Sequence, residues 1–232
     1  MPAVFDSAVF FKIIVNLKYE LLAVFRCYQD MVYPLLFLIL VMVLFPLSVS
    51  PDPVLLKKIS AGIFWIIVLF LVLLMLEQLF RNDWREGELE QLILMPNALS
   101  MAIFIKLFVF WLAISLPLII MTPFLSLCLY IPLRALKTLC WSILLGTPSL
   151  IFLGGIARAL TLGLRHSGLL IVLIVIPFYI PVLIFASSAV AFASMGLSAS
   201  GPLACLSVLM LLSVSLSPLL IRMILRLGIA FA

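Results

Sequence analysis

Five stretches of the sequence run without a single charged residue and are mostly apolar, and the charged residues gather between them. A helix needs about 20 residues to cross the hydrocarbon core of a bilayer, and a charged side chain at its centre costs about 2.5–3.5 kcal/mol. We therefore expect a membrane-spanning helix in each run of that length. The first four runs cover residues 31–51, 59–76, 107–133 and 138–157. The third span is expected to begin near residue 100, because Lys106 can extend its ammonium group to the interface.

The fifth run, residues 167–221, is too long for one crossing, because a helix rises about 1.5 Å per residue. We expect it to fold back within residues 193–202, which contain Gly196, Gly201 and Pro202. The runs are continuously apolar rather than alternating, which argues against a β-barrel. The sequence thus predicts an all-α membrane protein with a single integral membrane domain, 1–232. Its six spans are expected near 31–51, 59–76, 100–128, 138–157, 168–190 and 203–221.

Composition supports the same class. Hydrophobic residues make up 67% of the chain, charged residues 10%, and the mean hydropathy is +1.43. Soluble domains are about 45–50% apolar and about 25% charged. These values exclude a cytosolic enzyme, a disordered chain and a nucleic-acid-binding domain.

The distribution of cations predicts the orientation. Six spans place both termini on one side of the membrane. If that side is the cytoplasm, ten of the 14 Lys and Arg residues lie there, as the positive-inside rule requires. The four on the outer side are then Lys57, Lys58, Arg134 and Lys137. Before the first span, residues 1–30 carry a polar stripe on one helical face, which predicts an interfacial amphipathic helix. A short arm packed on a partner is the alternative.

Five of the nine acidic residues lie between the second and third spans: Glu77, Asp83, Glu86, Glu88 and Glu90. Glu77 can pair with Arg81 one helical turn later. Gly87 interrupts a helix and Pro96 stops it, while Leu89 contributes to a short apolar face. We predict a short cytoplasmic helix parallel to the membrane; a solvated charged loop is the alternative. No histidine or metal-ligand spacing accompanies these acids, so we assign them no catalytic role.

Several motifs resemble a known transporter family. Residues 86–90, followed by Pro96 and Lys106, resemble the signature of ABC-2-type exporter permeases. The chain is further similar to the CcmB family, the haem exporter permeases of cytochrome c maturation, in four stretches that occur in the same order. These are residues 44–48, 76–83, 144–150 and 180–186.

The resemblance implies the permease subunit of an ABC transporter complex in the bacterial inner membrane, required for haem export to the periplasm in c-type cytochrome biogenesis. It implies that a separate CcmA-like subunit binds and hydrolyses ATP, and this chain contains no GxxxxGK[ST] phosphate loop. CcmC-like and CcmD-like membrane subunits, a second copy of this chain and, indirectly, a periplasmic CcmE-like chaperone are the other implied partners. Haem is the candidate cargo; we assign no cofactor, metal or enzymatic activity to this chain.

The resemblance also assigns candidate residues. The segment between spans two and three would be the coupling helix that docks on the ATPase, with Glu77, Arg81, Asp83, Trp84, Arg85, Glu86, Gly87, Leu89 and Glu90. Independently of the resemblance, residues that interrupt or loosen helices are candidate hinges, with ordinary kinking of membrane helices as the alternative: Pro46, Pro96, Pro117, Pro123, Gly146, Pro148, Pro177 and Pro181. Arg158 and Arg165 either anchor to headgroups or attract the propionates of a cargo. The lone histidine, His166, is interpreted as a solvated loop residue rather than a haem ligand.

Two other functions fit the same features. One is an ABC-2 permease that exports another amphiphile, such as a lipid-linked glycan or a drug. The other is a membrane scaffold that anchors the ATPase without transporting anything. The sequence does not separate haem export from the scaffold function, because both use the same docking helix.

Overall fold

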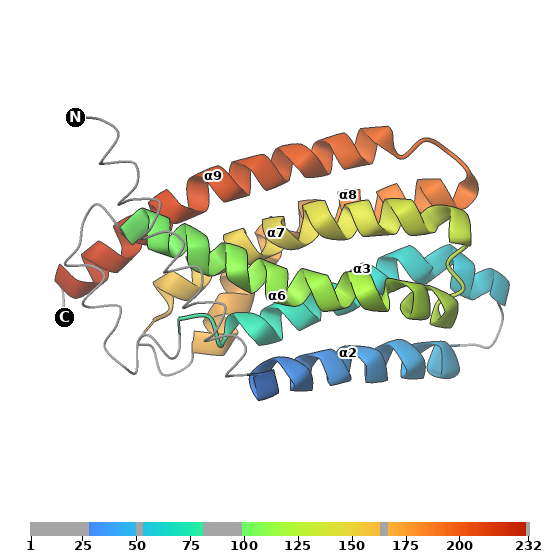
Figure 1. Cartoon of the computed structure of the whole chain (residues 1–232), viewed down its shortest axis with the longest axis horizontal. Coiled ribbons are helices and arrows are strands. Elements are labelled where there is room, and N and C mark those ends of the chain that lie inside the picture. The colour runs from blue at the N-terminus through green and yellow to red at the C-terminus, as the bar shows by residue number, and fades with distance from the viewer. Residues whose placement is uncertain (1–27, 50–52, 81–98, 163–166, 231–232) are drawn as a thin grey trace, which may run out of the picture.

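The computed structural model describes residues 28–49, 53–80, 99–162 and 167–230, and its regular secondary structure there is entirely helical. The helices form an elongated bundle in which α2 and α6 run in one direction and α3 and α9 return in the other (Figure 1). In chain order they are α2 (Tyr28–Val49), α3 (Pro53–Leu76), α6 (Leu99–Cys128), the 3₁₀ helix η1 (Leu133–Ala135), α7 (Leu136–Leu160), α8 (Ser167–Met195) and α9 (Ser200–Ala230). Helices are expected here, because a backbone in lipid must satisfy its own hydrogen bonds.

Within the part of the chain that the structure describes, five helices are long and apolar enough to cross a membrane: α3, α6, α7, α8 and α9. The chain is therefore a multi-pass membrane protein. The part of α2 whose side chains are described, Val32–Ser48, is apolar as well. The helix expected over residues 1–30 and the coupling helix lie outside the described residues, except that residues 28–30 already belong to α2.

The two ends of the bundle differ in the residues they carry. We call one the Phe80 end; α3 and α7 finish there and α6 begins there, and it holds Phe80 and Arg222. We call the other the Arg134 end; α8 finishes there and α9 begins there, and it holds Arg134 and Lys58.

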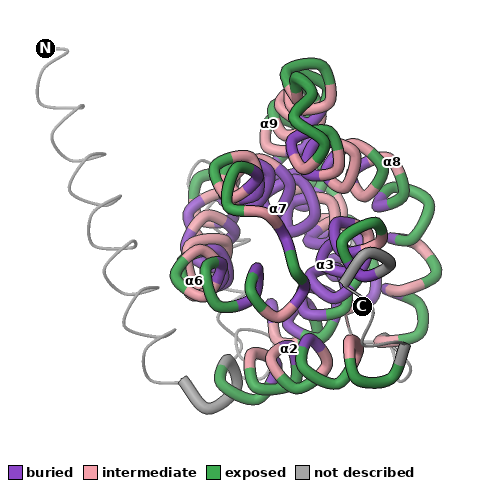
Figure 2. Tube along the Cα trace, turned by 90° about the vertical axis from the view of Figure 1, so that its right-hand side faces the viewer, coloured by how far each residue is buried: buried purple, intermediate pink, exposed green. Residues whose placement is uncertain are grey.

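The helix α7 lies at the centre of the bundle. It packs against α3, α6, α8 and α9, and the end-on view shows buried residues where α3 and α7 face the interior (Figure 2). Two polar contacts cross from its middle to neighbouring helices. The Trp111 Nε1–H of α6 donates to the Thr147 Oγ1 at 3.0 Å, and the Tyr179 hydroxyl of α8 donates to the Leu150 carbonyl at 2.6 Å. These contacts fix the rotation of α7 relative to α6 and α8.

Glycines let the neighbouring helices approach α7 closely. A Cβ added at Gly146 would collide with the ring of Trp65 on α3, and one added at Gly154 would collide with Leu76 and the Tyr179 hydroxyl. Small residues at helix interfaces allow this close approach in membranes. Trp65 and Tyr179 are fully buried as a result.

The chain reverses between α8 and α9 at a glycine, inside the stretch where the sequence predicted a break. Gly196 has φ +81°, a conformation that L side chains rarely adopt. The Leu197 N–H donates to the Phe192 carbonyl at 2.9 Å, the hydrogen bond of a glycine-capped helix end. Arg134 also donates, through Nη2, to the Ser194 carbonyl at 2.5 Å. The end of α8 is therefore tied to η1 as well as capped.

The helices extend beyond the charge-free runs from which the spans were predicted. The last predicted span, residues 203–221, lies inside α9, which continues to Ala230 and includes Arg222 and Arg226. A cation near the end of a span can remain helical, because its long side chain reaches the interface. Charge-free runs therefore underestimate helix length.

The predicted hinge residues in the described part of the chain lie inside continuous helices rather than at breaks. They are Pro46 in α2, Pro117 and Pro123 in α6, Gly146 and Pro148 in α7, and Pro177 and Pro181 in α8. Pro96 lies outside the described residues. A hinge role for these residues remains a prediction.

The close approach at Gly146 can be tested with leucine substitutions. Gly146→Leu should destabilise the protein by about 1–3 kcal/mol, because the new side chain overpacks against Trp65. Gly62→Leu is the matched control, because nothing lies within 4 Å of a Cβ added at Gly62 on α3. Unfolding of each variant in mixed detergent–SDS micelles measures the difference, and equal losses for both variants would contradict this packing.

Candidate functional site

The residues that follow α3 form a tight turn that leads into the predicted coupling segment. The Gln78 N–H donates to the Met75 carbonyl at 3.0 Å, and the Leu79 N–H donates to the Leu76 carbonyl at 3.2 Å. Phe80 then adopts φ 65°, which is uncommon for any residue except glycine. Its side chain is 2% exposed. Tertiary packing therefore holds Phe80 in a conformation that its own backbone disfavours.

Arg158 binds this turn from α7. Its side chain is 7% exposed, and its Nε–H donates to the Leu79 carbonyl at 3.0 Å. A buried charge is costly unless hydrogen bonds satisfy it, so this bond is a structural constraint rather than a surface contact. The sequence offered headgroup anchoring and cargo attraction for Arg158, whereas its Nε is directed to the backbone of the turn. Arg165, the other arginine in that prediction, lies outside the described residues.

Lys106 binds the same turn from α6. Its Nζ lies 6.0 Å from the centroid of the Phe80 ring, within the range of a cation–π interaction. The turn is thus held by α7 through Leu79 and by α6 through Phe80. We call these four residues, Leu79, Phe80, Lys106 and Arg158, the Phe80 anchor.

Two further contacts gather helices around the Phe80 anchor. Glu77 is exposed, and its carboxylate occupies the space that a side chain at Gly168 would need at the start of α8. Arg222 of α9 donates through Nη1 to the Ser100 hydroxyl of α6 at 3.3 Å. The anchor, Glu77 and this contact therefore bring together residues from α6, α7, α8 and α9 and from the turn that follows α3.

Of the nine predicted coupling residues, Glu77 belongs to the described part of the chain. The other eight are Arg81, Asp83, Trp84, Arg85, Glu86, Gly87, Leu89 and Glu90, all outside it. The Phe80 anchor was not predicted from the sequence. Two signals pointed toward it, an arginine and a lysine at the ends of otherwise apolar runs, but nothing in the sequence identifies a backbone carbonyl as the acceptor.

The described residues contain no group of three or more His, Cys, Asp or Glu side chains that could hold a metal ion. Cys128, Cys140 and Cys205 are present as thiols, and His166 lies outside the described part. The contacts that the structure describes at the Phe80 end are hydrogen bonds and charged contacts between helices. Such an arrangement can transmit movement between helices.

Substitution of Arg158 tests whether the anchor is structural. Arg158→Gln should destabilise the protein by about 1.5–3 kcal/mol, the range for hydrogen bonds that involve a charged group. Arg222→Gln is the control at the same end and should cost less, because Arg222 is more exposed and its bond to Ser100 is longer. The unfolding midpoint in detergent measures both effects; if Arg158→Gln costs no more than Arg222→Gln, the anchor is not structural.

Comparisons with known proteins find matches that cover nearly the whole chain. A family model described as CcmB protein matches residues 9–228. Heme exporter protein B of Haemophilus influenzae is 42% identical over 213 residues, which are 92% of this chain and 96% of that protein. The proteins of that name from Pseudomonas aeruginosa and Escherichia coli K12 are each 41% identical, over 88% and 91% of this chain and 92% and 96% of their own lengths. The chain belongs to the CcmB protein family.

Proposed function

We propose that this chain is the permease subunit of an ATP-driven complex that exports haem to the periplasm for c-type cytochrome biogenesis. Membership of the CcmB family and relatives named heme exporter protein B support the cargo. The observation that carries the mechanism is the Phe80 anchor. It joins the start of the acid-rich segment to the central helix of the bundle through the Arg158–Leu79 hydrogen bond.

The anchor explains how force from an ATPase would reach the membrane. The proposed coupling helix, residues 83–90, begins three residues after Phe80 and would dock on a CcmA-like subunit that hydrolyses ATP. When that subunit closes on ATP, the displacement passes through Leu79 to Arg158 on α7 and through Phe80 to Lys106 on α6. Because α7 packs against four other helices, a tilt of α7 moves these helices with it as rigid bodies. Without these contacts, the segment could move without moving α6 and α7.

The proposed topology has six spans in one domain, 1–232, with α2 as the first span. The Phe80 end and both termini face the cytoplasm of the bacterial inner membrane, and residues 1–30 form an interfacial helix. Support comes from the whole sequence, in which this orientation leaves four of 14 cations outside. The acid-rich segment then faces the compartment that contains ATP.

The proposed complex needs a second membrane half, because two ATPase subunits close together on two ATP molecules. A second copy of this chain would provide it, and CcmC-like and CcmD-like membrane subunits and, in the periplasm, a CcmE-like chaperone would act with it. Arg158 acts in this scheme as an anchor rather than as a cargo contact. Haem ligation is assigned to other subunits, and this chain supplies movement and coupling.

Charge reversal in the coupling helix tests the docking site. Glu90→Lys should reduce co-purification of the CcmA-like ATPase by more than about tenfold. The substitution replaces a negative charge in the proposed interface with a positive charge, which a complementary surface of the ATPase would repel or leave unpaired. Asp52→Lys makes the same charge reversal at the residue that precedes α3 in the sequence, outside the predicted coupling helix, and should leave co-purification unchanged. Both variants should insert into the membrane normally. Unchanged co-purification for Glu90→Lys would contradict the assignment of the coupling helix.

Reconstitution tests transport itself. Vesicles that contain this chain and its ATPase should move haem across the membrane in the presence of ATP, and substitution of Arg158 with Gln should lower transport more than ATP hydrolysis, because the anchor transmits the movement. Transport is measured by a haem-binding protein enclosed on the far side. ATP hydrolysis without haem movement would favour the scaffold function. Movement of a lipid-linked glycan or drug in place of haem would favour the other exporter function.

A further inference from the structure

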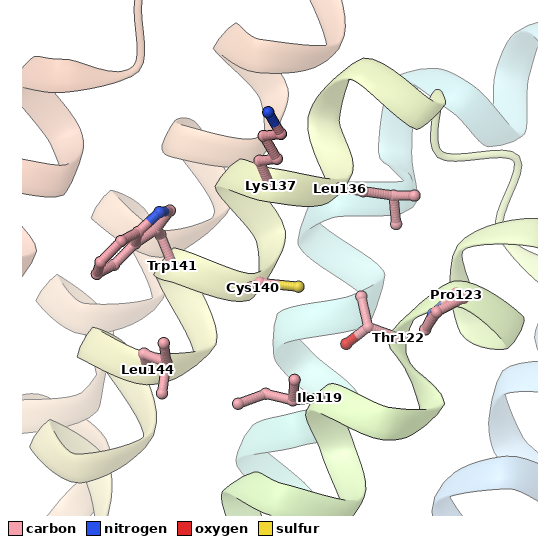
Figure 3. Close-up of a pocket in the computed structure, with 8 residues that line it drawn as sticks. All are labelled: Ile119, Thr122, Pro123, Leu136, Lys137, Cys140, Trp141 and Leu144. Atoms are coloured by element: carbon pink, nitrogen blue, oxygen red, sulfur yellow. The ribbon is translucent and has the colours of Figure 1, made fainter.

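A pocket of about 360 Å³ opens between α6 and α7 near the Arg134 end. Its walls come from both helices, and Figure 3 shows Cys140 and Leu136 of α7 pointing toward α6 while Thr122 of α6 points toward α7. Nothing in the proposed coupling mechanism uses this space. The wall residues of α6 and α7 are mainly Ile119, Thr122, Pro123, Leu136, Cys140 and Leu144.

The position of the pocket follows from the way α6 and α7 are joined. Near the middle of the pair, the Trp111–Thr147 hydrogen bond holds the two helices together at 3.0 Å. Farther toward the Arg134 end, Pro123 has no backbone N–H and its ring disturbs the regular helix. The pocket lies beside Pro123, where no such hydrogen bond joins the pair among the contacts described.

The chemistry of the pocket is that of an apolar slot with one cation. The Thr122 hydroxyl is fully buried and already donates to the Leu118 carbonyl at 2.8 Å, so the walls offer little to a polar ligand. Lys137 is exposed and extends toward the end of the bundle, beyond Leu136 and Cys140 (Figure 3). Trp141 is 59% exposed, and exposed tryptophans are typical of the membrane–water interface.

We propose that this pocket is a binding site for an anionic phospholipid. One acyl chain lies between α6 and α7 against Ile119 and Leu144, and the phosphate lies at the Lys137 ammonium. An acyl chain restores the dispersion contacts that an empty apolar slot lacks. A single lysine at the boundary attracts an anionic headgroup. In the proposed orientation the lipid belongs to the outer leaflet.

The same features favour a lipid over the other amphiphile relevant to this protein. Haem carries two carboxylates on a rigid plane and needs a ligand for its iron. The pocket offers one cation, and Cys140 is the one His, Cys, Met or Tyr side chain among the residues that line it. A flexible chain with one acidic head matches a slot with one cation at its mouth.

Cys140 provides a reporter inside the pocket. The full-length chain with Cys27→Ser, Cys128→Ser and Cys205→Ser retains Cys140 and is reacted with a maleimide in neutral detergent. Phosphatidylglycerol should protect Cys140 at a mole fraction about fivefold lower than phosphatidylcholine with the same chains, the factor expected from one lysine near an anionic headgroup. Native mass spectrometry of the wild-type chain should show retained phosphatidylglycerol, which covers the case in which the cysteine variant does not fold.

Three lysine variants separate specific binding from general attraction. Lys137→Gln should remove the preference for phosphatidylglycerol in both measurements, whereas Lys137→Arg should retain it. Lys57→Gln removes an exposed cation at the same end that does not line the pocket, and it should change nothing. The proposal is overturned if both lipids protect equally, if the preference survives Lys137→Gln, or if inorganic phosphate or haem protects better than phosphatidylglycerol. None of these outcomes bears on haem transport, because the assay contains neither ATP nor ATPase.

Discussion

The close approach of neighbouring helices to α7 is the constraint on which the rest of the bundle depends. Membrane helices gain no hydrophobic advantage by leaving lipid for one another, so packing and hydrogen bonds must hold them together. In α7, Gly146 receives the Trp65 ring and Gly154 receives Leu76 and Tyr179. The Trp65 Nε1–H has no hydrogen-bond partner, alone among the buried side-chain polar atoms of the described residues. Its ring is therefore held by shape rather than by polar contacts.

Because α7 packs against the other helices, the contacts that it makes at the Phe80 end affect the whole bundle. A hydrogen bond from Arg158 to the Leu79 carbonyl would matter little on an isolated helix. On α7 it connects the turn after α3 to the helix that packs against four others. Lys106 adds a contact from α6 to Phe80. The strained turn is thereby fixed in place at the point where the acid-rich segment begins.

The Arg134 end is organised differently from the Phe80 end, and the contrast is compatible with the coupling mechanism proposed above. Here Arg134 is bound to the Ser194 carbonyl at the end of α8, while α6 and α7 separate around a pocket beside Pro123. In the proposed mechanism α6 and α7 can tilt relative to each other at this end, because the described hydrogen bond between them, Trp111–Thr147, lies near their middle. A lipid chain in the pocket would fill the space without joining α6 to α7 covalently or by hydrogen bonds.

The sequence by itself determined the class of protein, the approximate positions of the long helices and a reversal within residues 193–202, because these follow from local properties. Absence of charge over about 20 residues decides insertion, and a glycine permits a positive φ. The sequence also contains the family motifs, including residues 144–150, but it does not show which contacts these residues make. Only the tertiary structure decided that Gly146 faces Trp65, that Thr147 faces Trp111 and that Arg158 binds the Leu79 carbonyl. Those contacts join residues that are 36, 79 and 81 positions apart. In a uniformly apolar chain no periodic pattern marks which face of a helix meets which neighbour.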